Sequence, residues 1–528
     1  MQSLNPWEEE LDVSTMADGL REGPLPKLLL PALTILAHPN PRRIGERVLL
    51  PALASGKLVE LSRLTPLFAA PGSGDVRPLA DPHLSRQPIQ LVPGESPGSV
   101  RISGGGPVEI LRASSPGHLS ASDIERGTVL ILAERVALLL HLAHPAPSSE
   151  TERFGLVGES APMIQLRGEV RRVAGLGMPV LLRGETGTGK ELVARALHEA
   201  GPRRGRPYLA LNLGAVSPSL AASELFGAAR GAFTGADRRR AGYFEQAHGG
   251  TLFLDEVGEA PPEVQVHLLR ALESGEIQPV GAETPLRVDV RVVAATDADL
   301  ETAVAEGRFR APLIHRLNGC EIHLPPLRER RDDVGRLLLH FLREELAALG
   351  EESRLEDPGP RGQPWLPAGL VARLADYDWP GNVRELRNVA RQIAAESREA
   401  RQARLPPALE RALSAPVRKP AEPRPERSRP GPRPAYRTPS EVGDEELLNA
   451  LRASHWNLAE AASRLRLSRT SLYALIERCP AVRKASDLSR DEILAALDRH
   501  EGDLNAAAGD LRVSPHGLRI RRTELGIP

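Results

Sequence analysis

The sequence predicts a multidomain fold: an N-terminal all-β sandwich, a central α/β domain followed by helices, and a C-terminal all-α region. Before residue 144, short apolar runs are broken by Gly and Pro and lack helical periodicity. The middle of the chain alternates strand and helix patterns, and the part after residue 440 is helical throughout. A chain of 528 residues is long enough for three or four such domains.

Two polar segments set the expected boundaries. Residues 144–152 form a short linker, and residues 414–440 form a longer one that is rich in Pro and Arg. The longer segment cannot bury enough apolar surface to fold, so we expect a flexible spacer, with loose contact to DNA phosphates as a second interpretation. The expected domains cover residues 1–146, 154–413, 441–482 and 486–528.

The composition indicates an ordinary soluble protein of a reducing compartment. A net charge of −1 excludes a DNA-binding surface spread over the whole chain, so any such surface is local. Cys320 and Cys479 lie far apart and have no metal-ligand neighbours, which favours a cytoplasmic location. The polar start of the chain is unlike a signal peptide, and the apolar stretch at residues 128–143 is too short to cross a membrane.

The first chemical motif is a glycine-rich loop between a predicted buried strand at residues 178–183 and a predicted helix that ends at Gly201. In this context, glycines let backbone N–H groups approach phosphates, and a lysine amine reaches the terminal phosphates. The next residue, Glu191, stands where the general motif has Ser or Thr, so the usual hydroxyl ligand of magnesium is missing. The residues expected to bind a nucleoside triphosphate are Gly184, Glu185, Thr186, Gly187, Thr188, Gly189, Lys190 and Glu191.

The second motif is an apolar strand, residues 252–254, that ends in Asp255 and Glu256. Strands that are apolar on both sides belong to parallel sheets, and ligands bind at the C-terminal ends of such strands. Many strands end in acidic pairs without a catalytic role. Because this pair follows a phosphate loop, we expect Asp255 to hold Mg²⁺ and Glu256 to polarise the attacking water.

The third motif lies between the first two and reads Gly231-Ala232-Phe233-Thr234-Gly235-Ala236. Glycines at both ends favour a mobile loop with Phe233 and Thr234 at its tip. The alternative is a helix turn whose Phe233 packs into the core of a general ATPase.

Together, these motifs resemble the central domain of bacterial enhancer-binding proteins, the AAA+ ATPases that activate sigma-54 RNA polymerase. The resemblance implies an α/β subdomain at residues 154–325 and a helical lid at residues 326–413. It also implies an enzyme that hydrolyses ATP with Mg²⁺, assembles as a hexameric or heptameric homo-oligomeric ring, and remodels the sigma-54 RNA polymerase holoenzyme so that the open complex forms. In that family, the loop at residues 231–236 contacts sigma-54.

The same resemblance assigns roles to further residues. Asn212 matches the residue that switches the catalytic glutamate. Arg310 and Arg316 match the arginine fingers that act on the neighbouring subunit, and Arg384 matches the lid arginine that senses the nucleotide. A guanidinium in these places can stabilise the charge that develops during phosphoryl transfer.

The sequence departs from the family pattern in three places. Thr296 is followed by Asp297 at the end of the sensor strand, where the family has Thr-Asn near the γ-phosphate. Pro312 replaces an aspartate beside the arginine fingers, and Ala228-Ala229 replaces a His-Glu pair before the loop. The sequence leaves the effect of these changes on ATP turnover open.

The last region contains an internal repeat. Glu446 aligns with Glu492, and the following residues match without a gap at the same offset of 46 residues. Each copy resembles a Fis-type helix-turn-helix module, which implies binding of double-stranded DNA at upstream enhancer sites. The residues expected to contact DNA are Arg469, Thr470, Ser471 and Tyr473 in the first copy and His516, Arg519, Arg521 and Arg522 in the second.

One Fis-type module per chain is usual, so the second copy either binds DNA or mediates protein contacts. For the whole region, a small helical bundle that dimerises is the alternative to DNA binding.

The N-terminal region resembles a forkhead-associated domain through Arg43-Ile44-Gly45 and Leu84-Ser85-Arg86. Such domains read phosphothreonine through a Gly-Arg pair, a Ser and an Asn. Here, Glu46 replaces the Arg, Pro88 replaces the His three residues after Ser85, and residues 115–117 lack the Asn-Gly turn. Because a carboxylate repels phosphate, we expect a degenerate sensory domain that keeps the fold without binding phosphopeptides.

The sequence therefore predicts an ATP-driven activator of sigma-54 transcription. One alternative is a DNA-binding regulator whose ATPase is impaired by Asp297 and Pro312 and that does not act through sigma-54. Another is a phosphopeptide adaptor with an accessory ATPase. The intact loop at residues 231–236 argues against the first alternative, and Glu46 argues against the second.

Overall fold

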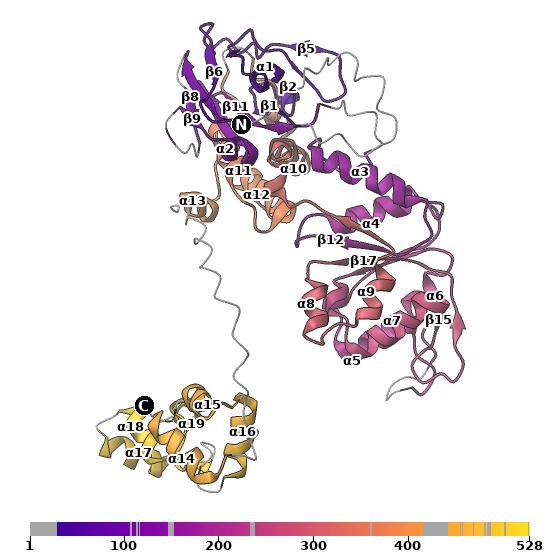
Figure 1. The fold of residues 1–528 in the computed structure, drawn as a ribbon, viewed down its shortest axis with the longest axis vertical. Helices are drawn as coiled ribbons and strands as arrows, with labels where there is room; N and C mark the ends of the chain where they lie inside the picture. The colour runs from indigo at the N-terminus through magenta and orange to yellow at the C-terminus, as the bar shows by residue number, and fades with distance from the viewer. Residues whose placement is uncertain are drawn as a thin grey trace, which may run out of the picture. The chain divides into compact units, whose positions relative to one another are not determined.

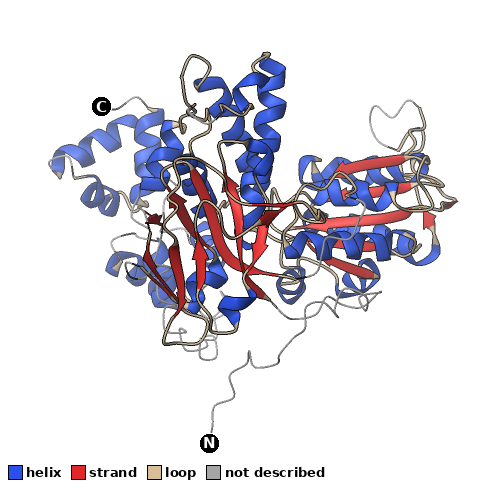
Figure 2. Ribbon diagram, turned by 90° about the horizontal axis from the view of Figure 1, so that it is seen from above, coloured by secondary structure: helices blue, strands red, loops and turns tan. Residues whose placement is uncertain are grey.

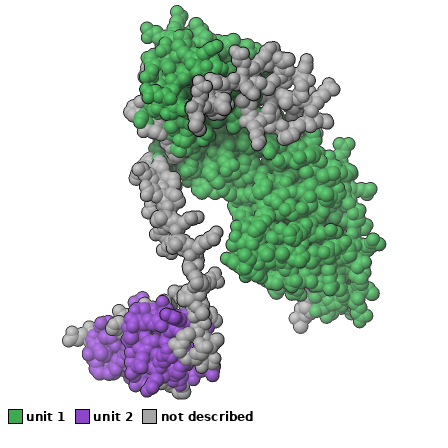
Figure 3. Space-filling model, viewed as in Figure 1, with its two compact units in different colours: residues 1–415 green, residues 416–528 purple. Residues whose placement is uncertain are grey.

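The computed structural model of the chain forms two compact units, residues 1–415 and residues 416–528 (Figure 3). It describes residues 29–105, 108–111, 115, 117–145, 153–232, 238–359, 362–414, 442–454, 456, 458–467, 469–479, 482, 487–500, 503–525 and 527. The predicted linker at residues 414–440 lies outside these ranges except for its first residue. Among the described residues, no helix is long and apolar enough to span a membrane.

The N-terminal part of the first unit is built from two antiparallel sheets, as predicted (Figure 1). The seven-stranded sheet contains, in spatial order, β5 (Val76–Arg77), β4 (Phe68–Ala69), β2 (Arg47–Leu49), β1 (Leu30–Ala37), β11 (Val136–Ala143), β10 (Thr128–Leu132) and β8 (Val108–Ile110). The four-stranded sheet contains β3 (Val59–Leu61), β6 (Ile89–Pro93), β7 (Val100–Gly104) and β9 (His118–Leu119). Helices α1 (Pro51–Ala54) and α2 (Ala121–Arg126) lie in the connections.

The central strands of the seven-stranded sheet are buried on both faces. Along β11, Leu138 and Leu140 pack in a core shared with the four-stranded sheet, whereas Ala137 and Leu139 pack against helices from much later in the chain. The same alternation occurs along β1 and β10. Burial on both faces explains why these strands are continuously apolar instead of alternating with polar residues.

The central region contains a five-stranded parallel sheet, also as predicted (Figure 2). Its strands, in spatial order, are β13 (Tyr208–Asn212), β14 (Thr251–Asp255), β17 (Arg291–Thr296), β12 (Val180–Arg183) and β18 (Cys320–His323). The associated helices are α3 (Ala161–Ala174), α4 (Lys190–Glu199), α5 (Pro218–Phe226), α6 (Tyr243–Gln246), α7 (Pro262–Ser274), α8 (Leu300–Ala305) and α9 (Ala311–Leu317). Apolar side chains of β12, β14 and β17 alternate between two cores, one on each face of the sheet.

Four helices follow the parallel sheet and form the predicted lid: α10 (Val334–Leu349), α11 (Ala368–Asp376), α12 (Asn382–Glu396) and α13 (Pro407–Ser414). Helices α10 and α12 pack against each other, and α10 and α11 contact β1. One hydrophobic core therefore joins the lid to the N-terminal sheet. This contact was not predicted from the sequence.

The second unit is helical in all its described elements. It contains α14 (Asp444–Ala453), α15 (Leu458–Leu465), α16 (Arg469–Arg478), α17 (Arg490–Arg499), α18 (Leu504–Asp510) and α19 (Pro515–Glu524). The first three helices enclose one apolar core and the last three enclose another. Each half of the second unit therefore has its own small helical core.

Candidate nucleotide-binding site

The glycine-rich loop connects β12 to α4 at the centre of the parallel sheet. Gly187 and Gly189 have φ values of +81° and +108°, which side-chain-bearing residues rarely adopt. The Thr188 hydroxyl donates to the Glu185 carbonyl at 2.8 Å and closes the loop on itself. The loop thus opens directly into the N-terminus of a ten-residue helix, the arrangement that favours an anion.

Lys190 is buried at the first position of α4. Its amine donates to the carbonyls of Gly184, at 2.7 Å, and Glu185, at 3.4 Å. Burial lowers the pKa of Lys190, while the carboxylates of Asp297, Asp255 and Glu256 act in the opposite direction. The loop carbonyls hold the Lys190 amine in place, and the carboxylates at the strand ends lie nearby. This arrangement is suited to binding a terminal phosphate together with a metal cation.

The acidic pair lies at the C-terminal end of β14, as predicted. Glu256 has φ +54° and ψ +46°, a left-handed conformation that is uncommon for residues other than glycine and typical of functional sites. A Cβ atom at Gly214 would lie 2.1 Å from Glu256 Oε2, so a larger residue there would displace the carboxylate. Asn212 is in register with Asp255, and its amide donates to Asp255 Oδ2 at 3.2 Å. The resemblance paired Asn212 with the catalytic glutamate. In this structure the Asn212 amide is bonded to the preceding residue, Asp255.

The unusual acid Asp297 lies at the mouth of the phosphate loop. The Thr186 hydroxyl donates to Asp297 Oδ2 at 2.5 Å. Thr296 is buried, and its hydroxyl accepts from the Ala298 amide at 3.0 Å. The aspartate is therefore tied to the loop that would hold the phosphates.

The lid touches the phosphate loop through the start of α12. The amides of Val383 and Arg384 donate to the Gly187 carbonyl at 3.0 and 3.3 Å. A Cβ atom at Gly187 would lie 2.4 Å from the Gly381 carbonyl oxygen, so glycine is required for this approach. Arg384, predicted to sense the nucleotide, is exposed and adjoins the loop.

Sequence reasoning missed two residues at this junction. Asn382 is fully buried, donates to Glu185 Oε2 and the Thr186 carbonyl, and accepts from the Leu327 amide. Arg328 forms a bidentate pair with Glu185 at 2.6 and 2.8 Å, and these hydrogen bonds hold the pKa of Glu185 down at about 2. The available signal was a polar side chain at the first position of an amphipathic helix, directly after Gly381.

Several predicted site residues lie outside this cluster. Glu191 is exposed in the first turn of α4 and lies 3.8 Å from Arg195. The Arg310 amide and the Arg316 Nε donate to α7, to Gln265 Oε1 at 3.0 Å and to the Leu272 carbonyl at 3.2 Å. Both arginine side chains are exposed.

Pro312 occupies the first turn of α9, where a missing backbone N–H costs no helical hydrogen bond. The substitution of the family's aspartate is therefore compatible with the helix.

The predicted sigma-54 loop is described only at its base. Ala228 and Arg240 exchange backbone hydrogen bonds at 2.9 Å, and Ala229 donates to the Val280 carbonyl at 2.9 Å. Ala228 and Ala229, which stand where the family has a His-Glu pair, therefore make these contacts through their backbone atoms and not their side chains. Gly231 has φ +80°, and Ala232 approaches Gly281 in the connection between β15 (Glu276–Ile277) and β16 (Leu286–Arg287). The remaining loop residues lie outside the described residues, namely Phe233, Thr234, Gly235 and Ala236.

The residues predicted to contact DNA fall at the starts and along the lengths of α16 and α19. Arg519 is exposed, whereas Arg521 and Arg522 donate to the carbonyls of Leu488 and Ile527, both at 3.4 Å. The last two arginines therefore hold their own module together. Ser471 lies in α16, and the side chains outside the description are those of Arg469, Thr470, Tyr473 and His516.

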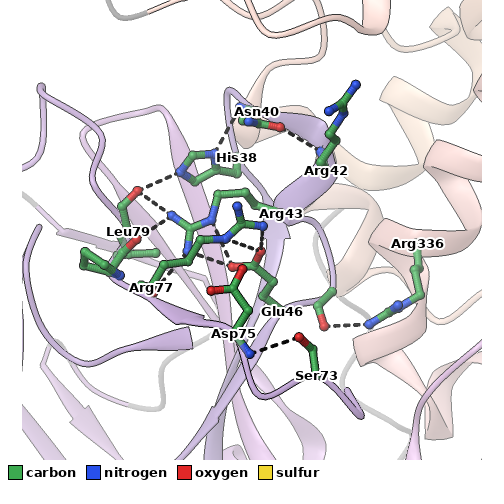
Figure 4. A network of polar contacts seen from close by, with 12 residues as sticks. His38, Asn40, Arg42, Arg43, Glu46, Ser73, Asp75, Arg77, Leu79 and Arg336 are labelled. Carbon is green, nitrogen blue, oxygen red and sulfur yellow. Dashed lines mark hydrogen bonds and ion pairs between the residues drawn. The ribbon is translucent and has the colours of Figure 1, made fainter. Parts of the chain in front are cut away.

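The structure shows the partners of Glu46 in the N-terminal region (Figure 4). Glu46 is buried, and its carboxylate accepts from Arg43, at 2.7 and 2.9 Å, and from Arg77, at 2.5 and 3.0 Å. The carboxylate is turned inward and neutralised, so it is not presented to a ligand. On the outer side, Arg336 of the lid donates to the Gly45 carbonyl at 2.6 Å.

A five-stranded parallel sheet, a phosphate loop, an acidic strand end and a helical lid define a nucleotide-binding domain of the P-loop class. Residues 156–323 match the sigma-54 interaction domain, and residues 328–421 match the AAA+ ATPase lid domain. Residues 438–477 match the bacterial regulatory protein, Fis family. The chain thus contains segments similar to a sigma-54 interaction domain, an AAA+ ATPase lid domain and a Fis-family regulatory protein.

Individual relatives match parts of the chain. The transcriptional regulator NtrC of Azospirillum brasilense is 47% identical over 254 residues, which cover 48% of this chain and 50% of the relative. DctD of Pseudomonas aeruginosa, a C4-dicarboxylate transport regulator, is 41% identical over 310 residues, which cover 58% of this chain and 64% of the relative. The chain thus spans about half the length of the NtrC relatives it matches.

Among solved structures, NtrX from Brucella abortus in complex with ADP aligns with 27% identity and a TM-score of 0.43, covering 72% of this chain and 71% of NtrX.

Proposed function

We propose that this chain is an ATP-hydrolysing transcription activator, which binds upstream DNA and remodels sigma-54 RNA polymerase so that the open complex forms. One observation carries the proposal: the phosphate loop, the acidic strand end and the anchored base of the residue 231–236 loop occur in one domain that matches the sigma-54 interaction domain.

The nucleotide site would hold ATP and Mg²⁺, which together supply the phosphoryl group and neutralise its charge. Loop amides and the Lys190 amine would bind the phosphates, Asp255 would hold the metal ion, and Glu256 would orient and polarise the water. Asn212 would couple to this pair through Asp255, to which it is already bonded. Contacts of Asn382 and Arg384 with the loop would report nucleotide binding to the lid.

Arg310 and Arg316 would act on the nucleotide of a neighbouring subunit in a hexameric or heptameric ring. Both side chains are exposed, and the contacts of these residues are with α7. The arginines are therefore placed outside the nucleotide site of their own subunit, which supports this role. A guanidinium supplied in this way would make ATP hydrolysis depend on assembly.

The test is ATP-dependent promoter opening with purified sigma-54 holoenzyme on a linear template. The proposal expects open complexes with ATP, none with ADP, and none when the polymerase carries a different sigma factor. ATP hydrolysis without promoter opening would favour the alternative of a regulator that does not act through sigma-54. The Thr186–Asp297 contact is the observation that favours that alternative, because a carboxylate at the loop opposes phosphate binding.

For the N-terminal region, we propose a degenerate forkhead-associated-like fold at residues 1–146. Two antiparallel sheets around a shared core support this fold. The inward Glu46 and the Arg336 contact at Gly45 support a role in docking on the lid of the same chain instead of reading phosphopeptides. The remaining proposed domains are the ATPase at residues 154–413 and the modules at residues 441–482 and 486–528.

A further inference from the structure

The Fis-family match ends at residue 477, yet the fold that it covers is repeated immediately afterwards. Helix α14 begins and ends 46 residues before α17, and α16 begins and ends 46 residues before α19. Helices α15 and α18 begin at the same offset. The repeat in the sequence is therefore a repeat of the structure.

The turn between the second and third helices is the same in both copies. Arg466 and Arg512 have φ values of +51° and +57°, which are uncommon for arginine. The backbone bond from the Leu467 amide to the Ala462 carbonyl, at 2.9 Å, has its counterpart at Val513 and Ala508, at 3.0 Å. Two copies that share a left-handed residue and its hydrogen bond at one position share the geometry that orients the third helix.

The apolar cores also correspond. Ala461 and Ala462 are buried in the first copy, as are Ala507 and Ala508 in the second. Leu472 at the inner face of α16 corresponds to Leu518 at the inner face of α19, and both are buried. Each third helix is thus held by the same contacts, with its opposite face outward.

The outward face of α19 has the chemistry of a base-reading surface. Arg519, Ile520 and Thr523 are exposed, and the Ile520 side chain retains 48% of its accessible area. The side chain of Arg519 makes no hydrogen bond or ion pair with any described residue. A guanidinium can bind guanine in two places at once, and an exposed aliphatic side chain can contact the thymine methyl group. Ser514 caps the helix by accepting from the Gly517 amide at 3.1 Å.

We propose that residues 487–527 form a second DNA-reading module, whose helix α19 enters the major groove and reads bases through Arg519 and Ile520. This inference rests on the DNA-binding role proposed for the first module. Each chain then carries two readers, and its binding site contains two sequence blocks instead of one.

The two modules touch within the second unit. A Cβ atom at Gly509 of α18 would lie 3.6 Å from Trp456 Cδ1, so the indole packs directly over this glycine. The first copy has Ser463 at the equivalent position. Because the two modules are in contact at this glycine, we expect a fixed spacing between the two blocks.

The experiment selects binding sequences from a random duplex pool with the full-length protein, without nucleotide. The wild type is expected to enrich two blocks at a constant spacing. Arg519→Ala is expected to lose one block, to bind the wild-type selected duplex about tenfold or more weakly, and to leave the other block unchanged. Arg519→Lys keeps the charge but loses bidentate recognition, so it should lose the same block while the salt dependence of binding persists.

The matched control is Arg490→Ala, which removes an exposed arginine from α17 of the same module and should bind like the wild type. Enrichment of a single block by the wild type, or retention of both blocks at wild-type affinity by Arg519→Ala, would overturn the proposal. A change of oligomeric state in Arg519→Ala with unchanged DNA binding would assign the module to dimerisation, which also overturns it. Because no nucleotide or polymerase is present, these outcomes are independent of the ATPase and sigma-54 tests.

Discussion

Arg47 of strand β2 donates to Asp332, two residues before lid helix α10, at 2.5 Å. The neighbouring Asp333 accepts from the amides of Glu159 and Ser160 at the start of the ATPase domain, at 2.6 and 3.1 Å. Arg330 of the same turn donates to the Thr188 carbonyl of the phosphate loop at 3.2 Å. A short polar path therefore connects the N-terminal sheet to the nucleotide site.

Removing Arg47 should destabilise the first unit. Burial raises the pKa of Asp332, and the guanidinium of Arg47 opposes that shift, so Arg47→Ala leaves a buried carboxylate without its main compensating charge. We expect a loss of about 3 kcal/mol in the free energy of unfolding, with part of it recovered in the double variant with Asp332→Ala. Denaturant unfolding measures both quantities.

The exposed Arg86→Ala serves as the control for loss of a positive charge and should change stability by less than about 0.5 kcal/mol. Additive effects of Arg47→Ala and Asp332→Ala would contradict an energetic contact between the two side chains.

The N-terminal sheet should lose stability in mild acid because of His141. Its ring nitrogen lies 2.8 Å from the Thr34 hydroxyl, and burial, assisted by Arg47, lowers the pKa of His141 to about 3. In the unfolded chain His141 is protonated below about pH 6.5, whereas in the folded chain it stays neutral until the pH approaches 3. The contribution of His141 to stability is therefore complete above pH 6.5 and declines as the pH falls towards 3, by up to about 1.4 kcal/mol per pH unit.

His141→Gln removes this titration and keeps a polar group beside Thr34. The difference in unfolding free energy between the wild type and the variant should shrink as the pH falls from 7 to 5. A constant difference over that range would show that His141 is not held neutral by the fold.

Glu256→Gln should bind ATP and lose turnover. The variant keeps the size of the side chain against Gly214 but removes the charge that polarises water. We expect a decrease in ATP turnover of about 100-fold or more, with ATP affinity changed little. Glu259→Gln, three residues along and exposed, is the control and should keep wild-type turnover. Normal turnover by Glu256→Gln would remove Glu256 from its proposed role.

Asp297→Asn should tighten ATP binding. A carboxylate tied to Thr186 at the phosphate loop repels the triphosphate, whereas the amide can donate to it. We expect a several-fold lower Kd for ATP, measured by titration calorimetry at fixed Mg²⁺. The exposed Glu273→Gln controls for the change in net charge. Unchanged affinity would mean that the carboxylate does not face the nucleotide.

The elements that were predictable are those with a local signal. The phosphate loop and the Asp255-Glu256 strand end were found because glycine spacing and apolar runs identify them without any long-range contact. The helix-turn-helix repeat was found because the two copies can be compared with each other within the sequence. The roles of Asn382 and Arg328 depend on how the lid meets the loop, and no local pattern specifies that contact.

The sequence indicates only in part that both faces of the N-terminal sheet are buried. Continuous apolar runs such as Val136–Leu140 indicate two covered faces, but they do not say that the second cover is the lid. The ion pairs of Glu46 could not be predicted because its partner Arg77, on β5, lies 31 residues away. The approach of such distant side chains depends on how the strands pair, which the sequence alone did not define.

The most direct test of the central claim is nucleotide-dependent binding of the full-length protein to purified sigma-54, with ATP and with a mimic of the hydrolysis transition state, beside Thr234→Ala. The account predicts a complex that requires the transition-state mimic and is lost in Thr234→Ala, while ATP hydrolysis by the variant persists. Absence of binding by a wild-type protein that still hydrolyses ATP would contradict the account and would separate the ATPase from sigma-54.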